Sequence, residues 1–142
     1  MTRKEKRLAR VTALQTSYAC ELSDNEPGII LAHLAEEEES QLTPEISAYA
    51  GKLVRLTIKN QGPVDAMIES RSSNWDIKRI TLVDRLILRL ALTEMMYVED
   101  VPPKVSISEA VEIAKIFSTE DSSGFVNGIL DSAYNDELKS GI

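Results

Sequence analysis

Hydrophobic residues recur at intervals of three and four along almost the whole chain, and strict alternation over the length of a strand is hard to find. This spacing places apolar side chains on one face of an α-helix. The first predicted helix runs from about Arg3 to Leu22 and ends in the turn-forming segment Ser23-Asp24-Asn25. Its helically spaced positions are Leu8, Val11, Gln15, Tyr18 and Leu22, and the pattern predicts an all-α protein.

Prolines and capping residues divide the rest of the chain into further helices. Pro27 suits the first turn of a short second helix, and Thr43-Pro44-Glu45 resembles an N-cap, a first-turn proline and an acid favoured by the helix dipole. The segment Asn60-Gln61-Gly62-Pro63 predicts the end of that third helix and the start of a fourth. Residues 71–74 are polar and predict a loop.

The second half of the chain contains the most apolar segment, from about Thr81 to Val98, which predicts a central helix. Ser106-x-x-Glu109 matches a capping box at the start of the next helix. A last helix is expected after residues 119–122, with Phe125 and Ile129 among its apolar positions. Together these elements predict one domain of six to seven helices over residues 1–142.

The composition offers few residues for disulfide bonds, metal binding or catalysis. With one cysteine, Cys20, it has no intramolecular disulfide, and its longest apolar run, Ile29 to Ala32, is too short for a signal peptide or a membrane span. We therefore expect a cytoplasmic protein that does not contact a membrane. The only histidine, His33, has no second ligand at metal-binding spacing, and the six glycines are dispersed. We expect no metal, no cofactor and no enzyme activity.

Charge is segregated along the chain. The formal net charge is −7, yet the first ten residues carry +4, which leaves −11 for the other 132. On a helix with about 100° per residue, Arg3, Arg7 and Arg10 fall within about 60° and form one stripe. Arginine suits bidentate contact with phosphate, although a disordered, solubilising terminus is the alternative. The acidic run Glu36–Glu39 is interpreted as a solvated helix end, with a surface that repels nucleic acid as the alternative.

Tyr18 falls on the border between the basic stripe and the apolar face. An aromatic ring there can stack an unpaired base while arginines hold the flanking phosphates. The alternative is a core ring with its hydroxyl group at the surface. The pattern alone leaves both open.

Four stretches carry a resemblance that spans the chain in order. They are Arg7-x-x-Arg10-x-x-x-x-Gln15-x-x-Tyr18, Asp84-Arg85-x-x-Leu88-Arg89-x-Ala91-x-x-Glu94, Pro103-x-Val105-x-Ile107-x-Glu109-Ala110-Val111-Glu112-x-Ala114-Lys115 and Asp121-Ser122-x-x-Phe125-Val126-Asn127-Gly128-x-Leu130-Asp131. In these stretches the sequence resembles the NusB family of transcription antitermination factors, most specifically in its last third.

The resemblance implies two packed helical halves and a non-enzymatic role in bacterial transcription. The implied partners are single-stranded boxA-like RNA of nascent ribosomal RNA leaders, a ribosomal protein acting as NusE, and the RNA polymerase antitermination complex. The implied RNA-binding residues are Arg3, Lys4, Lys6, Arg7, Arg10, Tyr18, Asp121 and Phe125. For Asp121, an N-cap role is an equally good interpretation, and Phe125 taken alone is interpreted as a core residue. Asp84 is implied as a candidate for contact with the protein partner, with an exposed helical ion pair as its alternative.

A second hypothesis is a helical protein-interaction module or homodimer without specific RNA binding, whose basic arm meets an acidic partner. Preference for boxA-like RNA over a scrambled RNA of equal charge would distinguish the two hypotheses.

Overall fold

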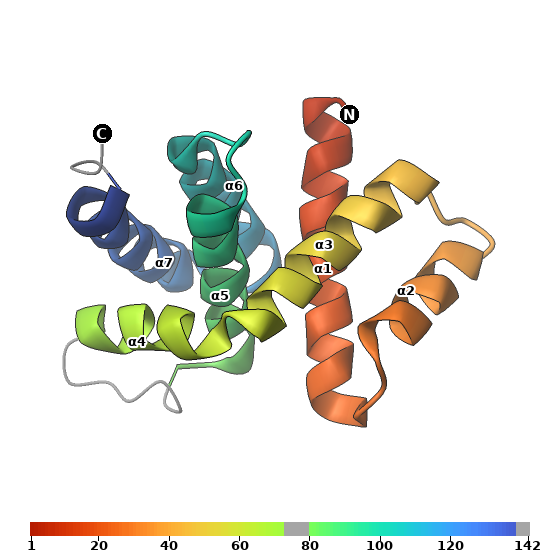
Figure 1. The fold of residues 1–142 in the computed structure, drawn as a ribbon, viewed down its shortest axis with the longest axis horizontal. Helices are drawn as coiled ribbons and strands as arrows, with labels where there is room; N and C mark the ends of the chain where they lie inside the picture. The colour runs from red at the N-terminus through yellow and green to blue at the C-terminus, as the bar shows by residue number, and fades with distance from the viewer. Residues whose placement is uncertain (73–79, 139–142) are drawn as a thin grey trace. The chain divides into compact units, whose positions relative to one another are not determined.

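The computed structural model describes residues 1–72 and 80–138, and in these ranges it contains seven α-helices and no strand. The helices are α1 (Arg3–Ser23), α2 (Pro27–Glu36), α3 (Pro44–Lys59), α4 (Gln61–Arg71), α5 (Leu82–Tyr97), α6 (Pro103–Phe117) and α7 (Glu120–Ala133), followed by a π-helical turn, η2 (Tyr134–Leu138) (Figure 1). The all-α prediction is confirmed. In the predicted loop 71–74, Arg71 is instead the last residue of α4, and residues 73 and 74 lie outside the described ranges.

The chain divides into two compact units, Met1–Lys59 and Asn60–Ile142. In the first unit, α1 packs against α3 and α2, and α2 also contacts α3 (Figure 1). Ile46, Tyr49 and Leu53 of α3 are buried, and Pro27 lies in the first turn of α2, as predicted. The acidic residues 36–39 are exposed, as expected of a solvated helix end.

The predicted inward face of α1 is wrong. Gln15 is exposed, Leu22 is 65% exposed, and Leu8 and Val11 are only half-buried. The buried face consists mostly of small side chains, namely Ala9, Arg10, Thr12, Ala13, Leu14 and Thr16. Thr16 Oγ1 donates to the Thr12 carbonyl group at 2.8 Å, and Thr12 Oγ1 donates to the carbonyl of Leu8 at the same distance. Because the helix satisfies these hydroxyl groups itself, threonine can be buried there at little cost.

In the second unit α5 is central, as predicted, and contacts α4, α6 and α7. Ten consecutive residues, 86–95, are all buried. Two of the buried polar residues on α5 bind neighbouring helices: the guanidinium group of Arg89 pairs with Asp65 on α4, and Glu94 accepts a hydrogen bond from Ser106 on α6. Burial of these groups is tolerated because each has a bonding partner.

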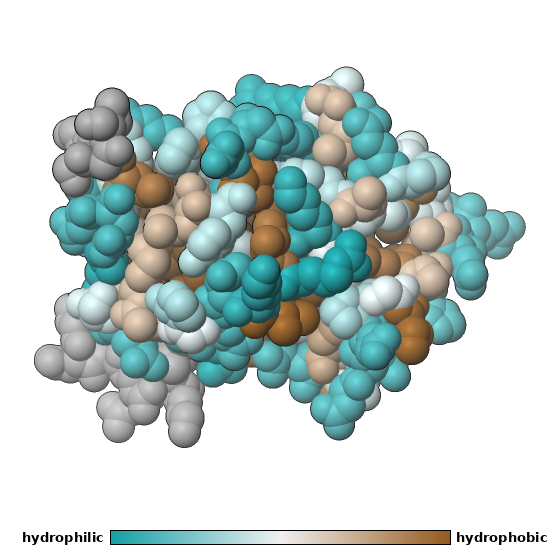
Figure 2. Space-filling model, in the orientation of Figure 1, coloured by the Kyte–Doolittle hydropathy of each residue, from teal (hydrophilic) through white to brown (hydrophobic). Residues whose placement is uncertain are grey.

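The predicted capping box at Ser106 and Glu109 is also wrong. Helix α6 begins at Pro103, so both residues lie within it, and both are buried. Ser106 Oγ donates to Glu94 Oε1 at 2.6 Å instead of capping the helix. Proline at the first position, with its fixed φ angle and no N–H group to satisfy, explains the earlier start. On the face shown in Figure 2, hydrophilic residues cover most of the surface and hydrophobic residues form small separate areas.

Candidate nucleic-acid interface

The basic residues at the N-terminus belong to an ordered helix. Thr2 Oγ1 accepts a hydrogen bond from the Glu5 backbone N–H group at 3.1 Å, and Glu5 Oε1 accepts one from the Thr2 N–H group at 2.9 Å. This reciprocal capping box starts α1 at Arg3. These hydrogen bonds lower the pKa of the Glu5 carboxyl group, so it is ionised at neutral pH. The basic N-terminal segment is therefore helical, and the alternative of a disordered terminus is wrong.

The five basic side chains differ in exposure. Arg3 and Lys4 are exposed, and Lys6 and Arg7 are half-buried. The ammonium group of Lys6 lies 4.7 Å from the centre of the Tyr49 ring, a cation–π contact with α3. Arg10 is only 9% exposed, which corrects the expectation of an exposed stripe of three arginines. It lies about one turn before Leu14 on the buried face of α1, a face that the hydrophobic periodicity did not predict.

Tyr18 is 41% exposed, so the interpretation as a core ring does not hold. It lies on α1 eleven residues after Arg7, about 16 Å along the helix axis at 1.5 Å per residue. Its neighbours on the buried side, Leu14 and Thr16, are enclosed. A large ring that keeps this much surface on a well-packed helix can stack a nucleobase without any change in the fold.

In the second unit, the two implied RNA-binding residues lie on α7. Asp121 is exposed and Phe125 is half-buried one turn later, on the same side of the helix. The N-cap is Thr119, whose Oγ1 accepts a hydrogen bond from the Ser122 N–H group at 3.0 Å, so the N-cap interpretation of Asp121 is wrong. Next to Phe125, a Cβ atom on Gly124 would meet no heavy atom within 4 Å.

Asp84 is not exposed as a docking residue would be. Its relative exposure is 5%, and Oδ2 accepts a hydrogen bond from Ser122 Oγ at 2.7 Å. This places it in contact with α7 and rules out an exposed helical ion pair. Its burial does not support direct contact with a protein partner, and no pattern in the sequence indicated that it contacts the helix of Phe125.

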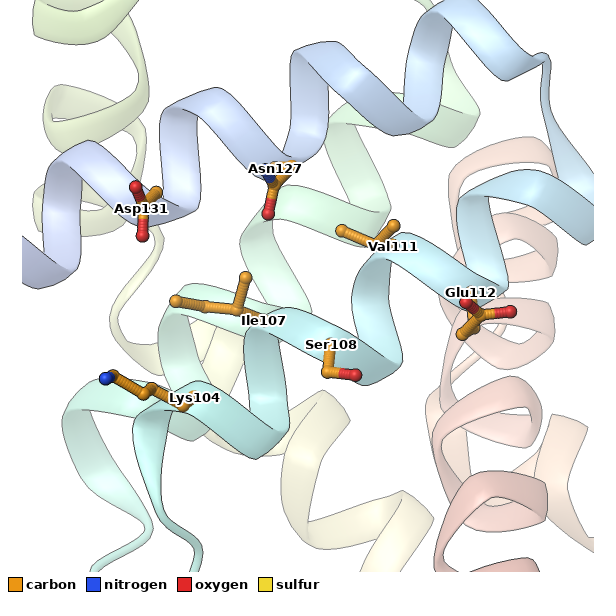
Figure 3. Close-up of a pocket in the computed structure, with 7 residues that line it drawn as sticks. All are labelled: Lys104, Ile107, Ser108, Val111, Glu112, Asn127 and Asp131. Carbon is orange, nitrogen blue, oxygen red and sulfur yellow. The ribbon is translucent and has the colours of Figure 1, made fainter.

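A groove that sequence reasoning missed lies between α6 and α7. Its volume is about 360 Å³, and it is lined by Lys104, Ile107, Ser108, Val111, Glu112, Asn127 and Asp131 (Figure 3). Figure 3 shows Asn127 and Asp131 on α7 facing the α6 side chains across it. These two residues belong to the most specific motif of the sequence, and two further members of that motif, Val126 and Leu130, are buried. The motif thus serves the core and the groove together.

The described residues hold no group of three or more His, Cys, Asp or Glu side chains that could bind a metal ion. His33 is exposed on α2. Burial, assisted by the negative charge of Glu21, raises the pKa of the Cys20 thiol, which keeps it protonated and poorly nucleophilic at neutral pH. None of the helices in the described ranges combines the length and the hydrophobicity that a membrane-spanning segment requires.

The fold and these side chains define an all-helical protein with a capped basic first helix and exposed aromatic surface, a class suited to binding nucleic acid. The NusB family model matches residues 7–135. The chain therefore belongs to the NusB family, and the resemblance seen in the sequence is confirmed.

Curated relatives and a solved structure agree with this assignment. The chain is 37% identical over 139 residues to the transcription antitermination protein NusB of Chloroherpeton thalassium, covering 96% of this chain and 64% of that protein. It is 35% identical over 142 residues to the protein of the same name from Thermodesulfovibrio yellowstonii, covering 94% of each. Among solved structures, a crystal structure of antitermination factors NusB and NusE in complex with dsRNA matches with a TM-score of 0.82 and 28% identity, over 94% of this chain and 98% of that one.

The family's role, transcription antitermination, is regulatory, which agrees with the expectation that the chain is not an enzyme.

Proposed function

We propose that this protein acts in transcription antitermination in the cytoplasm by binding boxA-like RNA together with a ribosomal protein of the NusE type, within a complex that contains RNA polymerase. The observation that carries the RNA-binding part is the capped, ordered α1, which presents exposed Arg3 and Lys4 and, later along its length, the exposed ring of Tyr18. The related structure with NusE and dsRNA supports both classes of partner.

The proposed RNA contacts fall on both compact units. On the first, Arg3 and Lys4 contact phosphates, with Lys6 and Arg7 contributing as far as their partial burial allows, and Tyr18 stacks a base. On the second, Phe125 supplies another ring and Asp121 accepts hydrogen bonds from base or sugar groups. Arg10, being buried, is assigned a packing role in α1 instead.

The strong negative charge outside the first ten residues shapes specificity. A surface carrying −11 over 132 residues repels the phosphate backbone, so RNA is directed to the basic positions of α1. Non-specific binding should consequently be weak, and the stacking contacts and the protein partner supply much of the discrimination.

Titration of RNA at several salt concentrations tests this function. Neutralisation of two to four phosphates of a single strand predicts that log affinity falls with log salt at a slope of about −1.4 to −2.8. Three RNAs of equal length are compared, namely boxA-like single-stranded, scrambled single-stranded and boxA-containing double-stranded, each with and without the NusE-type protein. Preference for the boxA-like strand supports the proposal, and preference for the duplex would assign the site to double-stranded RNA.

The alternative, a helical interaction module or homodimer without specific RNA binding, predicts equal affinity for boxA-like and scrambled RNA. It also predicts that Tyr18→Ala and Phe125→Ala change neither the salt slope nor the affinity for RNA. Light scattering of the free protein over a concentration series, with and without RNA, shows whether self-association competes with RNA binding.

A further inference from the structure

Two helix N-termini in the second unit are tied together by a hydrogen bond between equivalent positions. Asp84 is the third residue of α5, and Ser122 is the third residue of α7. Each has its backbone N–H group capped by a threonine three residues earlier, Thr81 at 3.4 Å and Thr119 at 3.0 Å. Ser122 Oγ then donates to Asp84 Oδ2 at 2.7 Å, a distance typical of a charge-assisted hydrogen bond.

The hydroxyl group of Ser122 is saturated by this arrangement. It donates to Asp84 and accepts hydrogen bonds from Ser118 Oγ at 2.9 Å and Thr119 Oγ1 at 3.0 Å. One donor and two lone pairs are all that a hydroxyl group offers. Ser122 therefore connects the N-cap residue Thr119 and the preceding Ser118 to the first turn of α7.

Asp84 is held for this contact at an energetic cost. The residue is only 5% exposed, and among the described residues its Oδ1 atom has no hydrogen-bond partner. A buried carboxylate oxygen without a donor is unfavourable. The carboxylate offsets part of this cost through its hydrogen bond to Ser122 and its place in the first turn of α5, where the helix dipole favours a negative charge.

We propose that Asp84 is a positioning residue for RNA binding, which acts through Ser122 to fix the first turn of α7. That turn carries Asp121, and Phe125 follows Ser122 by three positions on the same side of the helix. Helix ends fray unless they are tied. With the first turn fixed, the Phe125 ring is held in one orientation before RNA arrives, which reduces the ordering cost of binding. This inference rests on the proposed function.

Electrostatics alone predicts the opposite change in RNA affinity for Asp84→Ala. Removal of a negative charge from a protein that binds phosphate should tighten RNA binding. Positioning predicts that Asp84→Ala weakens it. The sign of the change in affinity therefore separates the two roles, which a simple loss of activity would not.

The experiment measures the affinity of the full chain for boxA-like single-stranded RNA at fixed salt. We expect Asp84→Ala and Ser122→Ala to lower affinity about 2- to 10-fold, the range that the net loss of one hydrogen bond produces. Asp84→Asn keeps an oxygen acceptor and Ser122→Thr keeps a hydroxyl donor, so each retains most of the affinity. Asp131→Ala removes an exposed carboxylate further along the same helix and is the matched charge control, with unchanged or tighter binding expected.

A double-mutant cycle with Phe125→Ala identifies the route of the effect. If Asp84 acts by orienting Phe125, Asp84→Ala causes no further loss in the Phe125→Ala background. The salt slope stays at the wild-type value because no phosphate contact is removed. Amide hydrogen exchange at residues 119–123 should be faster in Asp84→Ala and in Ser122→Ala, which reports the freed turn directly.

Tighter or unchanged RNA binding by folded Asp84→Ala, or full additivity with Phe125→Ala, would overturn the inference and leave the proposed function standing. Absence of RNA binding by the wild-type chain overturns both. If Asp84→Ala does not fold, Ser122→Ala decides the matter, because Ser122 is only half-buried and its substitution leaves no new buried cavity of comparable size.

Discussion

The guanidinium group of Arg89 pairs with the carboxylate of Asp65 at two points, with Nε donating to Oδ1 at 2.7 Å and Nη2 donating to Oδ2 at 2.9 Å. The pair joins α5 to α4 in the second unit, and the Arg89 side chain is only 8% exposed. Planar two-point contact fixes both the distance and the orientation between the helices. Asp65 is thus an anchor of this unit although it lies on a short, weakly amphipathic helix.

Asp65→Ala is expected to lower the free energy of unfolding by about 3 kcal/mol, because it leaves a buried cation without its carboxylate. The measurement is urea denaturation followed by circular dichroism. Asp100→Ala, which removes an exposed carboxylate in a turn after α5, is the matched control and should change stability by less than about 0.5 kcal/mol. Equal effects of the two substitutions would show that the pair does not stabilise the fold.

Arg10→Ala is expected to destabilise the protein by about 1–2 kcal/mol, because its stem and head group are buried. Arg3→Ala removes the same charge from an exposed position and should leave the thermal midpoint nearly unchanged. In RNA titrations, Arg3→Ala should reduce the magnitude of the salt slope by about 0.7. A stable Arg10→Ala protein with a reduced slope would instead make Arg10 a phosphate contact.

Tyr18→Ala is expected to weaken binding of single-stranded RNA by about 1–3 kcal/mol, the range measured for loss of one base–aromatic stack. Tyr18→Phe keeps the ring and should bind almost as the wild type does. Since the ring is 41% exposed, the loss of stability should be small in both. RNA affinity that is indifferent to Tyr18→Ala would exclude stacking on this residue.

Gly124→Ala is expected to stabilise α7 by up to about 1 kcal/mol, because alanine has the higher helix propensity and its Cβ meets nothing within 4 Å. Gly124→Lys should stabilise the helix less and should also tighten RNA binding, since it adds a cation beside Phe125. Gly124→Glu is the charge-reversed control. Tighter binding by both the lysine and glutamate variants would show that helix stability, not charge, determines the gain.

The start of α1 is expected to depend on pH through Glu5. The folded-state pKa of Glu5 lies below its ordinary value of 4.5, so its stabilising effect is fully present above that value and is lost as the pH falls through the lower folded-state pKa. Chemical shifts of the residue 2–5 amides, followed from pH 6 to pH 2, measure this. Glu5→Gln should remove the part of the transition that belongs to this carboxyl group, whereas Glu21→Gln, near the other end of α1, should not.

The local pattern of the sequence determined the helices and most of their ends. Spacing of three and four, together with prolines at the first turns of α2 and α3 and the apolar segment of α5, predicted these elements, because caps and periodicity act within a few residues. The family motifs indicated the class of function, which the hydrophobic periodicity alone did not indicate.

Tertiary packing decided which side of each helix is buried and which polar residues bind across helices. On α1, small alanine and threonine side chains form the buried face, and the larger apolar residues that the pattern favoured remain at or near the surface. Asp84 was expected at a surface, yet it bonds to Ser122 on another helix 38 positions later. Such choices depend on which helices meet and how closely they approach, and no local propensity encodes that distance.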